Sequence, residues 1–189
     1  MKIEEQIDRL QKNGWQMHDY TMTGTQTYLY GILFALPFLF LTGGLYRAFL
    51  LKHAVLLDHT GLIFLAAIIV SVPLHEGLHG LGWRIAGRLD RKTVSFLFRS
   101  GLPMCSCKAV LPVKTYLAGV LLPFLLLGGG SILFLVICPG TISLLTALVN
   151  LTLPGADLAI AFKVLKSGAV MIADCQDQTG FTGFHRDMP

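Results

Sequence analysis

The chain has 189 residues, of which 53% are hydrophobic and only 14% are charged, whereas a soluble domain carries about 25% charged residues. This composition argues against a soluble globular domain, a disordered tail and a disulfide scaffold, and it leaves a membrane protein with several spans. The net charge of +4 does not indicate a nucleic-acid partner, because excess Lys and Arg in a membrane protein mark its cytoplasmic side.

Residues 1–26 are a polar segment that precedes the first apolar run. Ile3, Ile7 and Leu10 share one face of a predicted helix that Gly14 is placed to end. Two interpretations of this helix stay open: it lies on the membrane surface, or it is a solvated helix of the tail. We expect no secretory signal peptide, because the apolar run that follows is too long for one.

Four long stretches are almost free of charge, and each predicts a membrane-spanning helix, since about 20 apolar residues cross a bilayer. Only Glu76 and Asp157 carry charge within them, and Pro139 with Gly140 marks the turn between the last two. The predicted fold is an all-α membrane protein in which residues 1–189 form a single integral membrane domain. The spans cover residues 28–46, 60–83, 115–137 and 141–162.

The positive charges predict how these spans are oriented. Of the 15 Lys and Arg residues, 13 lie in segments that a four-span chain places on one side. These segments are 1–26, the loop 84–114 and the tail 163–189. The positive-inside rule therefore places both termini and the long loop in the cytoplasm, and the protein in the cell membrane as a multi-pass protein.

The loop between spans two and three contains the signals of a short β-hairpin. Residues 93–98 are rich in β-branched and aromatic side chains, 99–103 read as a turn, and 104–111 can form the second strand. A cytoplasmic hairpin close to the membrane either pairs with an extended substrate segment or only covers the neighbouring site. The sequence favours neither.

The four cysteines are expected to be free thiols. Cys105, Cys107 and Cys175 fall on the predicted cytoplasmic side, where thiols stay reduced. The pair Cys105 and Cys107 lacks a second pair with which it would form a soft-metal site.

Span two contains the H-E-x-x-H pattern over residues 75–79. His75 and His79 are four residues apart, so both project from one helix face and can bind one zinc ion at about 2.0–2.1 Å. Glu76 is then placed beside the metal-bound water, as a general base and later an acid. The alternative is a packed histidine pair with a hydrogen-bonded Glu, but three ionisable groups without a function are costly in a membrane.

A catalytic zinc site needs a third protein ligand, and Asp157 is the candidate. His79 lies five residues before Arg84, and Asp157 lies six residues before Lys163, so both are about 7.5–9 Å from the cytoplasmic edge. This shared depth favours Asp157. The other candidates lie at the opposite end of span two (His53, Asp58 and His59) or in a tail that would have to fold back (Asp174, Asp177 and His185).

Asn150 precedes Asp157 by seven residues, so the two would share a face of a regular helix. Pro154 and Gly155 interrupt that helix, and irregular backbone at membrane depth is tolerated only where it is buried in protein or lines a wet cavity. Asn150 is therefore a candidate catalytic residue that donates a hydrogen bond to a substrate carbonyl or an oxyanion. A hydrogen bond to another helix explains it equally well.

Together these residues resemble the site-2-protease type of intramembrane zinc metalloprotease, and more closely a family of small bacterial zincin peptidases. In the wider group, one membrane helix carries H-E-x-x-H, and a later helix carries an Asn…Pro…Asp-Gly motif whose Asp is the third ligand. The resemblance extends over residues 60–184 and includes 118–124 and 174–180, although Leu158 stands where the motif has Gly. The matching residues are His75, Glu76, His79, Asn150, Pro154 and Asp157.

The resemblance implies a peptidase, whereas the residues alone imply a zinc site able to activate water. We interpret the chain as a Zn2+-dependent protease of a membrane-anchored protein or peptide, cut near the cytoplasmic face. The metal ligands are His75, His79 and Asp157, and the catalytic candidates are Glu76 and Asn150. Its partners are then the substrate and the lipid bilayer. The rival is a non-catalytic metal-binding membrane protein that acts as a sensor, transporter or scaffold.

Overall fold

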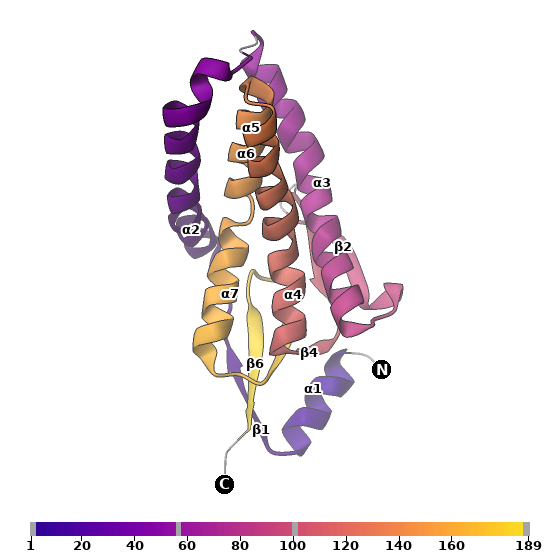
Figure 1. Ribbon diagram of the computed structural model, residues 1–189. Helices are drawn as coiled ribbons and strands as arrows, with labels where there is room; N and C mark the ends of the chain where they lie inside the picture. The colour runs from indigo at the N-terminus through magenta and orange to yellow at the C-terminus, as the bar shows by residue number, and fades with distance from the viewer. Residues whose placement is uncertain (1–2, 56–57, 100–101, 187–189) are drawn as a thin grey trace.

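Four long helical segments stand side by side over a small β-sheet in the computed structural model (Figure 1). The structure describes residues 3–55, 58–99 and 102–186. Each segment is long and apolar enough to cross a membrane, which confirms the number and the place of the predicted long helices. The segments cover Gly24–His53, Thr60–Gly87, Val113–Ile137 and Thr141–Ser167.

The first two segments have defined ends. Thr23 starts the first through a capping box, in which its side chain accepts a hydrogen bond from the helix backbone. Arg88 ends the second in the left-handed backbone region, at φ 51°. The elements of these segments are helix α2 (Gly24–Leu45), the π-helical turn η1 (Tyr46–Leu50), the 3-10 turn η2 (Leu51–His53) and helix α3 (Thr60–Gly87).

The third segment contains a π-helical turn, and the fourth is interrupted. In the fourth, the helix stops after Thr152 and resumes at Gly155, because proline lacks the N–H that a continuous helix needs at Pro154. The break predicted at Pro154 and Gly155 is thus present. The elements are α4 (Val113–Pro123), the π-helical turn η4 (Phe124–Gly128), α5 (Gly129–Ile137), α6 (Thr141–Thr152) and α7 (Gly155–Ser167).

The predicted hairpin is present beside α3, after the 3-10 turn η3 (Arg91–Thr93). Strand β2 (Val94–Arg99) pairs antiparallel with β3 (Leu102–Cys107). The second strand was expected over residues 104–111 and the turn over 99–103, but β2 extends to Arg99 and β3 covers Leu102–Cys107, with one more bond from the Lys108 N–H to the Thr93 carbonyl. The chain then leaves the hairpin and joins a different sheet.

That second sheet was not predicted, so an all-α fold with only a hairpin is incomplete. It has four antiparallel strands in the order β1-β6-β5-β4, and it joins the two chain ends to the loop before α4. Helix α1 (Ile3–Lys12) rests on it, since Gln6 accepts a hydrogen bond from the Val110 amide at 3.1 Å. The strands are β1 (Trp15–Asp19), β4 (Val110–Pro112), β5 (Met171–Asp174) and β6 (Phe181–Arg186).

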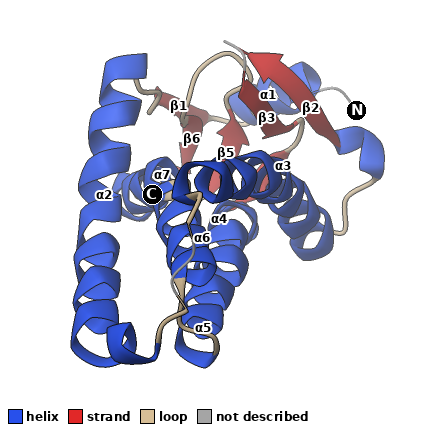
Figure 2. Ribbon diagram, turned by 90° about the horizontal axis from the view of Figure 1, so that it is seen from above, coloured by secondary structure: helices blue, strands red, loops and turns tan. Residues whose placement is uncertain are grey.

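Looking down the bundle, α2 lies on one side and α3 on the other, with α4, α6 and α7 between them (Figure 2). Helices α3 and α4 approach closely at a pair of glycines, since a Cβ on Gly82 would lie 2.7 Å from the Cα of Gly119. Small residues allow this proximity. The main core fills the space between these helices and the sheet, and it includes Trp83, Tyr116, Val164, Ile172 and Phe181.

Candidate metal centre

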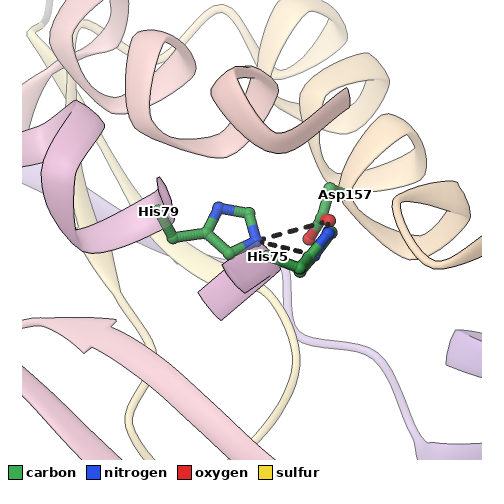
Figure 3. A group of neighbouring side chains, drawn as sticks. All are labelled: His75, His79 and Asp157. Atoms are coloured by element: carbon green, nitrogen blue, oxygen red, sulfur yellow. Dashed lines mark hydrogen bonds and ion pairs between the residues drawn. The ribbon is translucent and has the colours of Figure 1, made fainter. Parts of the chain in front are cut away.

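Two histidines of α3 and one aspartate of α7 converge in the interior (Figure 3). The Nε2 atoms of His75 and His79 lie 3.1 Å apart. Oδ2 of Asp157 lies 3.0 Å from the first and 3.4 Å from the second. The structure therefore brings together the three residues that the sequence predicts as metal ligands, from two different helices.

The spacing of these three atoms fits a tetrahedral metal site. Tetrahedral ligand atoms at about 2.0–2.1 Å from one zinc ion lie roughly 3.3–3.4 Å apart, and the three distances here, 3.0, 3.1 and 3.4 Å, are close to this separation. Both histidines are about 95% buried, and the buried Oδ2 of Asp157 faces their two Nε2 atoms. Two nitrogen lone pairs and a carboxylate oxygen facing one another are the donor set of catalytic zinc sites, so the residues fit this metal.

His79 is held in the orientation that a metal ligand needs. Its Nδ1 lies 3.0 Å from the carbonyl oxygen of Gly119 on α4, so Nδ1 carries the proton and Nε2 is free to face the cluster. Its ring stacks on Trp83, with ring centroids 5.6 Å apart, and the indole N–H donates to the carbonyl of Tyr116. Helix α4 thus fixes the metal-facing side of α3 through its backbone.

Glu76 lies beside the cluster but is not part of it. Its Oε2 accepts a hydrogen bond from the backbone N–H of Cys105, on strand β3, at 2.6 Å. The hairpin therefore contacts the candidate general base directly. Neither sequence interpretation of the hairpin, substrate pairing or simple cover, included this contact.

One cavity of about 780 Å3 contains all four of these side chains. It reaches from the cluster past α2 and β3 to the loop that joins β5 and β6. The polar groups of the cluster are thus accessible from a space large enough for a peptide segment.

Asn150 is not brought to this cavity. It lies on α6, is 5% exposed, and its Oδ1 has no hydrogen-bond partner within the described residues. The expectation that it shares a face with Asp157 assumed a continuous helix, and the interruption between Thr152 and Gly155 removes that phase relationship. A catalytic role for Asn150 stays a prediction.

The tail does fold back, as an alternative third ligand would require, but none of its described residues joins this cluster. Asp174 ends β5 and instead accepts hydrogen bonds from the Cys107 amide and the Tyr116 hydroxyl. The roles of Asp174, Cys105 and Gly119 were not found from the sequence. For Asp174 and Gly119 a signal existed, because they lie in the segments 174–180 and 118–124 that carry the family resemblance.

A protein family described as "Putative zincin peptidase" matches residues 68–171, which is more than half of the chain. The chain belongs to this family. No curated protein and no solved structure matches it. The region shared with the zincin peptidase family contains His75, Glu76, His79 and Asp157 together with the hairpin and α4. Membership points to a metallopeptidase and implies zinc as its metal.

Proposed function

We propose that the chain is a zinc-dependent intramembrane peptidase that cleaves a membrane-anchored protein or peptide near the cytoplasmic face. The observation that carries the proposal is the convergence of His75, His79 and Asp157 within a cavity that also contains Glu76. These side chains lie on helices apolar enough to cross a membrane. Ionisable groups at such positions are retained for function, since each costs at least about 2.5–3.5 kcal/mol.

The chemistry follows from the place of each side chain. When bound, zinc supplies a Lewis acid that polarises a carbonyl group and lowers the pKa of a bound water toward about 7. His75, His79 and Asp157 hold the ion from two helices. Glu76 takes a proton from the attacking water and gives it to the leaving amine.

The orientation of the protein is part of the proposal. The positive-inside rule places α1, the hairpin, the four-stranded sheet and both termini in the cytoplasm. The loop between α5 and α6 then faces the other side of the bilayer. The cavity is lined in part by β3, by Asp174 at the end of β5 and by the loop between β5 and β6, so a substrate bound in it would lie close to the cytoplasmic surface.

The experiment compares wild-type protein with Glu76→Gln in a cell membrane. Zinc content is measured on the purified proteins, and cleaved membrane proteins are identified by comparing the peptides of the two membrane fractions. We expect equal zinc content and a loss of cleavage of about 100-fold or more in Glu76→Gln, since a general base contributes about 10²–10⁴-fold. Glu4→Gln, an exposed substitution in α1, is the matched control.

Full proteolytic activity in Glu76→Gln would overturn this mechanism. Zinc binding without any cleavage that depends on Glu76 would instead favour the rival function, a metal-binding membrane protein without hydrolysis.

A further inference from the structure

The carboxylate of Asp174, which is not one of the candidate metal ligands, links strands β5 and β3 and helix α4 through hydrogen bonds. Asp174 ends β5, accepts the Cys107 amide of β3 at 3.0 Å on Oδ2, and accepts the Tyr116 hydroxyl of α4 at 2.8 Å on Oδ1. No Lys or Arg of the described chain forms an ion pair with it. The contacts of this carboxylate therefore serve neither the metal nor a salt bridge.

The bond to Cys107 has a consequence at Glu76. Cys105 and Cys107 are two residues apart in one strand, so their N–H groups point to the same edge of β3, away from β2. Asp174 accepts a hydrogen bond from the Cys107 N–H, and Glu76 accepts one from the Cys105 N–H. The two carboxylates thus bind one strand edge at points about 7 Å apart.

The hairpin needs such an anchor. It has only two strands, and an isolated two-stranded hairpin is marginally stable in water. Strands β2 and β3 pack against Gly80 of α3, and this packing restricts the distance between the hairpin and the helix. The hydrogen bond from Cys107 to Asp174 additionally fixes the strand along its own direction, because a one-residue slip would turn this N–H to the other edge.

We propose that Asp174 is a positioning residue for Glu76: by holding Cys107, it places the Cys105 N–H that orients the Glu76 carboxylate toward the metal cluster. The inference rests on the proposed function, in which Glu76 is the general base. A misplacement of a catalytic group by about 1 Å can cost 100-fold in rate. Loss of the anchor therefore lowers kcat, while the substrate cavity and KM change little.

The first test measures the hydrogen bond from Cys105 to Glu76 directly. Full-length protein labelled with 15N-cysteine in detergent gives one amide signal for each of its four cysteines, assigned by single Cys→Ser substitutions. The short bond to a carboxylate shifts the Cys105 amide proton downfield, and Glu76→Gln moves it back. Asp174→Ala is expected to move the same signal in the same direction, in metal-free and in zinc-loaded protein. Asp90→Ala, at an exposed carboxylate before β2, is the control.

The second test reads the reaction. Asp174→Ala is expected to lower kcat by about 10- to 100-fold, with KM within about twofold and zinc content unchanged. Asp174→Asn keeps an oxygen for the Cys107 amide, and its amino group can donate to the Tyr116 oxygen. This conservative variant is therefore expected to restore both the Cys105 signal and most of kcat.

An unchanged Cys105 signal in Asp174→Ala overturns the proposal. If Asp174→Ala does not fold, Asp174→Asn decides: retained kcat supports positioning, and a 10-fold loss with zinc retained overturns it, because the charge would then be what the site needs. If Glu76→Gln leaves cleavage intact, the proposed function fails. The amide signals then still decide whether Asp174 sets the place of Glu76.

Discussion

The carbonyl oxygen of Gly119 accepts a hydrogen bond from Nδ1 of His79 across the contact between α4 and α3. The contact is possible because residue 119 has no side chain, since a Cβ there would overlap the indole ring of Trp83. One glycine therefore provides both the close approach of two helices and the orientation of a metal ligand.

Gly119→Ala is expected to push α4 away from Trp83 and to lengthen the bond to His79. Loss of the hydrogen bond that orients a metal-binding histidine weakens metal binding by about 10- to 100-fold. Overpacking at the helix contact lowers the free energy of unfolding by about 1–3 kcal/mol. Competition with a chelator measures the first effect, and thermal unfolding in detergent measures the second. Gly129→Ala, where a Cβ would meet nothing within 4 Å, should change neither.

Asp157→Ala is expected to reduce bound zinc from one equivalent to well below it. The two histidines alone give only two of the three protein ligands that catalytic zinc sites have. Elemental analysis after dialysis measures the loss, with Asp58→Ala, an exposed residue before α3, as the matched control. An unchanged zinc content in Asp157→Ala would mean that the ligand assignment is wrong.

The cluster of His75, His79 and Asp157 could be predicted from the sequence because its geometry follows from local spacing and from positions counted along the apolar segments. His75 and His79 share a helix face by their spacing alone, and the distance of Asp157 from Lys163 gave it the same expected depth as His79. The long helices could be predicted for a similar reason, because missing charges are visible without knowledge of tertiary contacts.

The four-stranded sheet could not be predicted, since its strands are short and two of its three pairings join residues far apart in the chain. Trp15 in β1 pairs with Arg186 in β6, and β4 has only three residues. Alternation over so few residues gives no periodic signal. The roles of Asp174 and Cys105 depend on this pairing and on the hairpin register, so they became visible only in the folded chain.

Asp174 is expected to make the protein less stable as the pH rises from about 4 to above 7. Burial raises the pKa of its carboxyl from 3.8 to about 7, against hydrogen bonds from Cys107 and Tyr116 that lower it. Between these two values the folded chain holds a proton that the unfolded chain has released, so the free energy of unfolding falls with increasing pH.

Thermal unfolding at pH 5 and pH 8 measures this effect. The decrease in Tm between the two pH values should be smaller in Asp174→Asn than in wild type, by at least about 2 °C. Asp90→Asn should keep the wild-type decrease, because its side chain is exposed. Equal decreases in wild type and Asp174→Asn would show that this carboxyl does not titrate across the transition.

The cysteines allow a test of the proposed orientation in the membrane. Cys138 is exposed at the end of α5, Cys105 and Cys107 are buried, and Cys175 is intermediate. Burial also raises the pKa of the Cys105 and Cys107 thiols to about 12, so neither forms the thiolate that reacts with maleimides near pH 7.

A membrane-impermeant maleimide added to intact cells should therefore label Cys138 alone, and Cys138→Ser should abolish the signal. After permeabilisation, Cys175 should become labelled as well. Labelling of Cys175 but not Cys138 in intact cells would reverse the orientation, and it would place the metal cluster near the outer face of the bilayer.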